Sequence, residues 1–112
     1  MPQLSILIPV YNELENIPLL HNEILAAIVP LNVSFEILFV DDGSDDGSGE
    51  RLQALAIQDP HVRVVRLRRN FGQTAAMQAG LDYAQGDIIV SLDASMAEAD
   101  AYRRPASFSH AF

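Results

Sequence analysis

Four aspartates stand together in the glycine- and serine-rich stretch LFVDDGSDDGSGE, residues 38–50. They are Asp41, Asp42, Asp45 and Asp46, and they directly follow an apolar run. Carboxylates can ligate a hard cation or accept hydrogen bonds from a ligand, whereas burying them in a core is costly. The stretch therefore indicates a loop that faces a charged or metal-bound ligand. The alternative is a solvated turn that caps a helix, because Asp, Gly and Ser are common turn residues.

Two further polar groups also follow apolar runs. Asp93 ends the run in DIIVSLDAS, where one carboxylate could hold a divalent cation against a diphosphate. The alternative is an ordinary strand-end aspartate satisfied by backbone N–H groups. Arg68 and Arg69 open RRNFGQ, and their guanidinium groups could pair with a diphosphate. The alternative there is a basic solvated turn, with Asn70 and Gly72 present for turn geometry.

Several well-known ligand loops do not match the sequence. A calcium loop of EF-hand type that started at Asp42 would have Gln53 where a bidentate glutamate is required. The acidic stretch has no lysine for a phosphate loop, and the first strand is followed by PVYNELEN rather than a glycine-rich dinucleotide fingerprint. His21, His61 and His110 lack metal-ligand spacing, and we expect them at the surface.

The elements that position these groups are four short apolar runs separated by helical patterns. Such runs are typical of strands buried on both faces of a parallel sheet. The order βαβαβαβ with right-handed crossovers predicts an α/β fold with a three-layer, Rossmann-like parallel sheet. The predicted strands are Leu4–Val10, Phe35–Val40, Val62–Leu67 and Asp87–Leu92.

The helical patterns carry their own start and stop signals. Apolar residues recur at helical spacing from Ile17 to Ile28, Ser48 is a plausible N-cap of the second helix, and Gly86 a C-terminal stop of the third. Ligands of open α/β sheets bind beyond the carboxyl ends of the strands. The sequence therefore predicts that the polar stretches meet at one edge as a ligand cleft, where Tyr11 could stack on a base or simply pack.

Composition excludes some classes of function. The chain has 112 residues, 49% of them hydrophobic, and a formal net charge of −8, so we expect one small domain that does not bind nucleic acid. It has no cysteine, which rules out disulfides and thiolate metal sites within it. The N-terminus does not resemble a signal peptide, and no apolar run reaches the roughly 18 residues of a spanning helix. We therefore expect a cytoplasmic location.

Three segments, ILIPVYNELENI, ILFVDDGSDDGS and RLRRNFGQTAAMQAGLDYAQGDIIVSLDA, resemble family 2 glycosyltransferases. The resemblance is strongest to the polyprenyl-phosphate sugar transferases, of the dolichyl-phosphate mannose synthase and bactoprenol glucosyltransferase type. It runs in order over residues 3–94, and NFGQTAAMQAG is its most specific part. It implies the nucleotide-binding half of a glycosyltransferase A-type fold.

The resemblance also implies roles for individual residues. Pro9, Tyr11 and Glu13 would line the base and ribose pocket. Asp42 would contact the base, and Asp41 would support the acidic loop.

At the other end of the nucleotide, Gln73 would lie near the ligand. Asp93 would be the first aspartate of a D-x-D motif that binds the ribose and diphosphate with Mg²⁺ or Mn²⁺. The resemblance assigns no catalytic residue.

The sequence departs from the family pattern after Ala94. Ser95 stands where the second, metal-ligating aspartate belongs, and a hydroxyl is a poor replacement for a carboxylate at a hard cation. Residues 96–112 follow no family pattern. We expect a nucleotide-sugar-binding half-domain over 1–95 and an atypical tail over 96–112, as in a truncated or frame-shifted product.

The resulting functional prediction is an incomplete glycosyltransferase that is inactive alone. Its donor would be a nucleotide sugar, and the acceptor of the complete enzyme a polyprenyl phosphate at the cytoplasmic face of a membrane. The alternative is a non-catalytic nucleotide-binding or interaction domain. A receiver-type domain fits less well, because its aspartate and lysine positions are not matched. An unpaired edge at the fourth strand predicts self-association.

Overall fold

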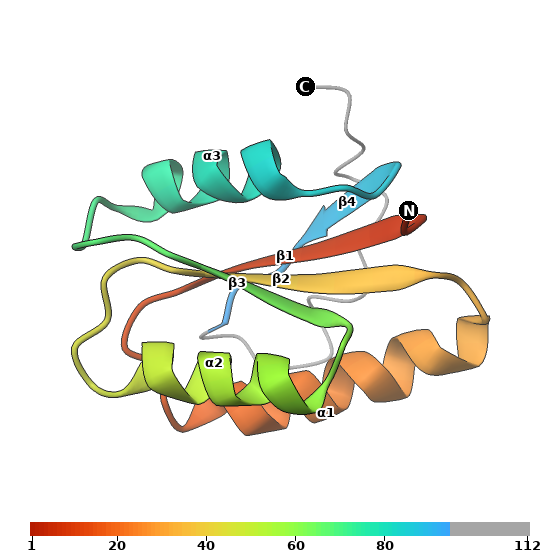
Figure 1. The fold of residues 1–112 in the computed structure, drawn as a ribbon, viewed down its shortest axis with the longest axis horizontal. Helices are drawn as coiled ribbons and strands as arrows, with labels where there is room; N and C mark the ends of the chain where they lie inside the picture. The colour runs from red at the N-terminus through yellow and green to blue at the C-terminus, as the bar shows by residue number, and fades with distance from the viewer. Residues whose placement is uncertain (95–112) are drawn as a thin grey trace.

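A computed structural model describes residues 1–94, in which strands and helices alternate along the chain (Figure 1). The helices in this range are α1, Asn16–Ile28, α2, Ser48–Gln58, and α3, Gln73–Tyr83, and a 3₁₀ turn, Val29–Leu31, follows α1. The predicted order of elements is confirmed. The strands, all rich in apolar and β-branched residues, are β1 Leu4–Val10, β2 Phe35–Asp41, β3 Val62–Arg66 and β4 Ile88–Ser91.

The strands form one parallel sheet in the order β3-β2-β1-β4. The central pair is in register along its length, from Leu4 opposite Phe35 to Val10 opposite Asp41. All strands therefore end at the same edge, on the left of Figure 1, where the loops to α1, α2 and α3 begin. The predicted three-layer, Rossmann-like arrangement is confirmed.

Helices cover both faces of the sheet, as buried parallel strands require (Figure 1). Helices α1 and α2 lie on one face, where the apolar stripe of α1 meets alternate residues of the central strands. Helix α3 lies on the other face and comes close to β1, because a Cβ on Gly80 would be 2.4 Å from Leu7 Cδ1. The core between the sheet and α1 and α2 includes Ile6, Ile8, Val10, Ile17, Leu20, Ile24, Ile37 and Phe39.

A buried carboxylate on the α3 side of the sheet connects β1, β3 and the α3–β4 connection near the amino ends of the strands. Glu36, only 4% exposed, accepts hydrogen bonds from Ser5 Oγ, from the Gln85 N–H (2.7 Å) and from the guanidinium of Arg63. Burial by itself would raise the pKa of Glu36, but these donors outweigh it and the pKa is lowered. The α3–β4 connection is therefore fastened to β1 and β2 by a charged group.

Two of the predicted helix boundaries are wrong. Gly47, with φ 97°, is the N-cap of α2, and Ser48 is the first helical residue, with its hydroxyl turned to Asp46. Helix α3 ends at Tyr83 with an extended Ala84. Gly86 lies beyond this end and has a different reason to be glycine, because a Cβ there would be 2.6 Å from the Ser5 nitrogen.

Smaller differences concern strand ends and one histidine. Strand β2 extends one residue further than predicted, β3 ends one earlier, and β4 is shorter by one residue at each end. His21 is not a surface residue: its side chain is 12% exposed and its Nε2 lies 2.7 Å from Asp59 Oδ2, a bond that joins α1 to the end of α2. Ser95, His110 and the predicted tail lie outside the described residues. Over residues 1–94, no helix is long and apolar enough to cross a membrane.

Candidate functional site

A pocket of about 390 Å³ opens at the carboxyl edge of the sheet. It is bordered by the ends of β1 and β4, the start of the acidic loop and the first residues of α3. Six of the residues to which the family resemblance assigns a role, all but Asp41, lie on its wall, whereas Arg68 and Arg69 do not. The lining residues are Pro9, Val10, Tyr11, Glu13, Asp42, Asn70, Gly72, Gln73, Asp93 and Ala94.

Asp42 forms one wall of the pocket, and protein donors already surround its carboxylate. It is 4% exposed and accepts hydrogen bonds from the Phe71 N–H (2.8 Å), the Gly72 N–H (3.0 Å) and Asn70 Nδ2 (3.0 Å). Both carboxylate oxygens therefore bind residues 70–72, the Asn-Phe-Gly turn that leads into α3. The contact of Asp42 with a base, which the sequence suggested, stays a prediction.

The acidic loop also packs against that turn through its backbone. Gly43 has φ +74°, and a Cβ built on it would lie 2.2 Å from the carbonyl carbon of Arg69. Glycine is required here both for the left-handed conformation and for the close approach. Gly72, the N-cap of α3, has φ 104° and ψ 160°, a region that is essentially restricted to glycine. These two glycines fix the path of the chain beside Gln73.

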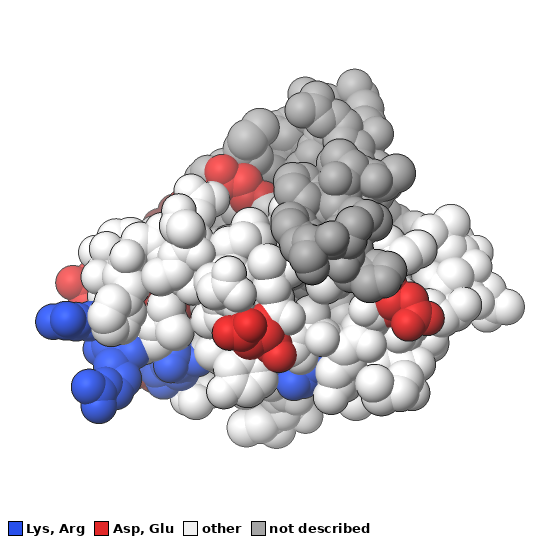
Figure 2. Space-filling model, turned by 90° about the horizontal axis from the view of Figure 1, so that it is seen from above, with Lys and Arg blue, Asp and Glu red and all other residues white. Residues whose placement is uncertain are grey.

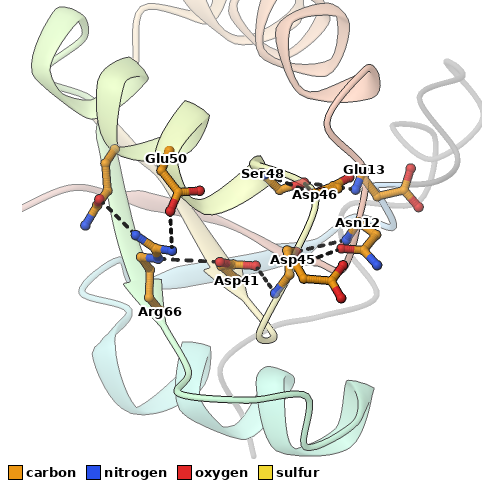
Figure 3. A network of polar contacts seen from close by, with 10 residues as sticks. Asn12, Glu13, Asp41, Asp45, Asp46, Ser48, Glu50 and Arg66 are labelled. Atoms are coloured by element: carbon orange, nitrogen blue, oxygen red, sulfur yellow. Dashed lines mark hydrogen bonds and ion pairs between the residues drawn. The ribbon is translucent and has the colours of Figure 1, made fainter.

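Asp41 lies beneath the acidic loop rather than in the pocket. It is 1% exposed, and its Oδ1 accepts a hydrogen bond from the Ser44 N–H at 3.1 Å. The Nε of Arg66 lies 3.6 Å from its other oxygen, and the same guanidinium reaches Glu50 on α2 at 3.2 Å (Figure 3). This geometry is compatible with the predicted supporting role of Asp41.

The other side of the acidic loop meets the β1–α1 loop (Figure 3). Asp46 Oδ1 accepts hydrogen bonds from both the hydroxyl (2.6 Å) and the N–H (2.9 Å) of Ser48. Burial alone would raise the pKa of Asp46, but the donors of Ser48 and the Leu14 N–H outweigh it and the pKa is lowered. Asp46 is therefore held in its ionised form as an acceptor for neighbouring backbone.

Arg68 and Arg69 do not line the pocket. Both are exposed on the β3–α3 connection, and the Arg69 guanidinium lies 4.9 Å from the ring centre of Phe71, which is itself 51% exposed. Seen from the side of α3, basic side chains gather at one end of the molecule (Figure 2). The pairing of these arginines with a diphosphate in the pocket stays a prediction.

Three carboxylates line the pocket among the described residues, those of Glu13, Asp42 and Asp93. Asp42 is committed to the Asn-Phe-Gly turn, and residues 1–94 contain no group of three or more His, Asp or Glu side chains placed to hold a metal. Mg²⁺ is commonly held by one or two carboxylates together with substrate phosphates. The donor set therefore fits a metal that arrives with a diphosphate, rather than an all-protein metal site.

Sequence reasoning missed part of the pocket wall. Asn70 and Gly72 were interpreted only as turn residues, yet both line the pocket. Their signal was present, because the Asn-Phe-Gly turn follows a strand that ends at the same edge. Ser44, Asp46 and Ser48, which hold the β1–α1 loop, carried no such signal, because their partners are backbone amides about 32–35 residues away along the chain.

Comparisons with known proteins agree with this geometry. The profile described as Glycosyl transferase family 2 matches residues 5–95. Undecaprenyl-phosphate 4-deoxy-4-formamido-L-arabinose transferases from Yersinia enterocolitica and Yersinia pestis are each 45% identical to the chain over 95 residues, which is 84% of this chain and 29% of the relative. The chain thus spans less than a third of the length of these curated relatives.

Two solved structures are similar in fold. A mannosyltransferase, PcManGT from Pyrobaculum calidifontis, was solved in complex with GDP-Man and Mn²⁺; it superposes with a TM-score of 0.66 at 25% identity, over 92% of this chain and 32% of that one. TarS from S. aureus superposes with a TM-score of 0.67 at 22% identity, over 89% of this chain and 32% of that one. The arrangement of β1–β4 is that of the glycosyltransferase A-type fold.

Proposed function

Because the chain belongs to glycosyl transferase family 2, we propose that its pocket binds the nucleotide of a nucleotide-sugar donor. The observation that carries the proposal is a convergence of residues on one pocket at the carboxyl edge of the sheet. Pro9, Tyr11 and Glu13 come from the end of β1 and the loop after it, and Asp93 comes from the segment after β4. That edge is where open α/β sheets bind their ligands.

The pocket suggests a division of roles among its residues. Tyr11 is 46% exposed at the end of β1 and offers an aromatic face on which a base can stack. Glu13 and Gln73 offer polar atoms for the ribose and the diphosphate. Asp42 contributes by fixing the turn that carries Gln73, and a further contact with the base is compatible with its place on the wall.

Asp93 is the residue that we propose holds Mg²⁺ or Mn²⁺ together with the donor diphosphate. The ion, when bound, would neutralise negative charge on the diphosphate leaving group. The Pyrobaculum mannosyltransferase, solved with GDP-Man and Mn²⁺, supports a metal ion at the donor site by similarity.

For the complete protein, we propose transfer of a sugar to a polyprenyl phosphate at the cytoplasmic face of a membrane. The Yersinia relatives, which are named as undecaprenyl-phosphate transferases, support the acceptor class. A phosphate oxygen of the acceptor would attack the anomeric carbon as the nucleoside diphosphate leaves. A non-catalytic binding domain is less favoured, because the matching family is one of glycosyl transferases and the curated relatives are named as transferases.

Isothermal titration of the chain with UDP and with GDP, each with and without Mn²⁺, tests the proposal. One of the two nucleotides should bind, and more tightly with Mn²⁺. Tyr11→Ala should weaken binding about tenfold or more, the scale of one lost stacking contact of 1–3 kcal/mol, in order-of-magnitude terms. Asp93→Asn should remove most of the Mn²⁺ dependence.

Matched controls exist on the surface of α3. Tyr83 is 55% exposed and lies outside the pocket wall, so Tyr83→Ala removes a comparable aromatic ring without touching the site. Asp82→Asn likewise removes one carboxylate charge outside the pocket and is the control for Asp93→Asn. If neither nucleotide binds, or if the control variants weaken binding as much as the pocket variants, the proposal is wrong.

A further inference from the structure

Three consecutive backbone amides of the β1–α1 loop donate hydrogen bonds to side chains of the acidic loop. Figure 3 shows two of the donor residues, Asn12 and Glu13, beside this loop. We call these three acceptor side chains the clamp. Each bond joins segments more than thirty residues apart in the chain, so the clamp is a tertiary feature. The bonds run from Asn12 N–H to Ser44 Oγ at 2.9 Å, from Glu13 N–H to Ser48 Oγ at 3.1 Å and from Leu14 N–H to Asp46 Oδ2 at 3.3 Å.

The members of the clamp support one another. The hydroxyl of Ser48, a residue with 0% exposure, donates its hydrogen to Asp46 Oδ1 at 2.6 Å. This leaves the Ser48 oxygen as the acceptor for the Glu13 N–H. Linked hydrogen bonds of this kind polarise one another. The Asp46 carboxylate therefore has two effects: it accepts the Leu14 N–H, and it orients the Ser48 hydroxyl so that the serine oxygen accepts the Glu13 N–H.

The clamp binds the part of the β1–α1 loop that forms one wall of the pocket. Tyr11 and Glu13 both line the pocket, and Asn12 between them has φ 52°, in the left-handed region. A non-glycine residue in that region persists only when its surroundings hold it there. Asn12 is held from both sides, because its side-chain oxygen also accepts the Asp45 N–H at 3.0 Å.

We propose that Ser44, Asp46 and Ser48 are positioning residues, which hold the β1–α1 loop so that Tyr11 and Glu13 form the wall of the nucleotide pocket. The effect on ligand binding rests on the proposed function, whereas the effect on the loop does not. The second half of the acidic stretch thus shapes the pocket without touching the ligand.

The neighbouring aspartates provide a matched test. Asp45 and Asp46 are both exposed, and each change to asparagine removes one negative charge. Asp45 uses its backbone N–H towards Asn12, whereas Asp46 uses its carboxylate in the clamp. Asp46→Asn should speed solvent exchange of the Glu13 and Leu14 amides, measured by NMR, by about tenfold, and Asp45→Asn should leave it unchanged.

Amides in the sheet distinguish a local effect from general unfolding. The Asp42 N–H, bonded to Val10 O at 2.8 Å, and the Leu67 N–H, bonded to Asp41 O at 2.8 Å, should keep their protection in Asp46→Asn. Titration with the nucleoside diphosphate and Mn²⁺ should show about tenfold weaker binding for Asp46→Asn than for Asp45→Asn. Ser48→Ala should show the same changes as Asp46→Asn. Ser48 is buried, so this variant could fail to fold, and in that case the result for the exposed Asp46 alone tests the proposal.

Equal exchange at Glu13 and Leu14 in the two asparagine variants would overturn the proposal. So would a loss of protection that extends through the sheet, since this would show a general effect on stability. If the parent chain binds neither nucleotide, the proposed function fails, and the exchange contrast between the two variants still decides whether the clamp holds the loop.

Discussion

At the scale of single residues, the carboxylates of the acidic stretch have separate tasks. Asp41 anchors the loop from below, Asp42 holds the Asn-Phe-Gly turn and Asp46 holds the β1–α1 loop. Three of the four carboxylates are thus used within the protein, each on a different neighbour. A stretch that appears in sequence to be a ligand-binding loop is, in its contacts, mainly a support for the two loops that border the pocket.

Asp42 is the residue at which this distinction is most easily tested. Asp42→Ala would leave the Phe71 and Gly72 N–H groups without their acceptor, and the Asn70 amide would keep only its 3.2 Å hydrogen bond to the Asp42 carbonyl. We expect a loss of about 1–3 kcal/mol in the free energy of unfolding, measured by urea denaturation, because partly buried donors lose their partner. Nucleotide binding should weaken as well, because Gln73 follows the released turn.

Asp45→Ala is the control for that change, since it removes an exposed carboxylate of the same loop. A variant Asp42→Ala with the stability and nucleotide affinity of the parent would show that the turn does not depend on Asp42.

At the scale of elements, α3 depends on a charged contact at the edge of the sheet opposite the pocket. Glu36 on β2 receives the Gln85 N–H just after α3, and Arg63 on β3 reaches both Glu36 and the Tyr83 carbonyl at the end of the helix. These contacts therefore connect the end of α3 to β2 and β3.

The pKa of Glu36 gives this contact a pH dependence. Because the folded-state pKa lies below that of an ordinary glutamate, Glu36 contributes stability above the unfolded-state value of about 4.3 and loses it as the pH falls towards the folded-state pKa. Glu36→Gln should lower the free energy of unfolding at pH 7 by about 1–3 kcal/mol. Below pH 4 the difference between variant and parent should shrink.

Urea unfolding between pH 3 and pH 7 measures this effect, with Glu15→Gln, at an exposed position, as the charge control. The assignment of the pH dependence to Glu36 is wrong if the difference between Glu36→Gln and the parent is the same at every pH.

At the scale of the whole molecule, β4 is an outer strand of the described sheet, and one of its sides is unpaired. Among residues 1–94, β4 pairs only with β1, and Ile88 on it is 49% exposed. A strand with an unpaired edge and apolar side chains offers a template for another chain. The relatives are more than three times as long as the segment that this chain matches.

We therefore predict concentration-dependent self-association of the chain, measured by sedimentation velocity. Ile88→Lys should reduce it, because a charged side chain opposes edge pairing. A single monomeric species over a hundredfold range of concentration would contradict the prediction.

We also predict no sugar transfer to a polyprenyl phosphate by this chain alone. Catalysis requires donor and acceptor to be held in register, and the chain spans 29% of the length of the transferases that it resembles. The measurement is transfer of radiolabelled sugar from a nucleotide sugar to undecaprenyl phosphate by the purified chain. Turnover above the background of a Tyr11→Ala, Asp93→Asn double variant would refute the prediction.

The sequence by itself determined the elements and the edge where they place their polar ends. Apolar runs of strand length and helical spacing between them were sufficient for the βαβαβαβ order and the parallel sheet, because burial on both faces leaves a strand little choice of composition. The same reasoning brought Tyr11, Asp42 and Asp93 to one edge, since parallel strands all end on the same side.

Only the tertiary structure decided what each polar group does there. Asp42 and Asp46 are identical in type and lie in repeated Asp-Gly-Ser sequences, yet one faces the Asn-Phe-Gly turn and the other the β1–α1 loop. The start of α2 at Ser48 and the reason for Gly86 were misjudged on the same ground. Local patterns report the backbone preferences of a residue, but the partner of a hydrogen-bonding side chain is set by which distant segments the fold brings within about 3 Å of it.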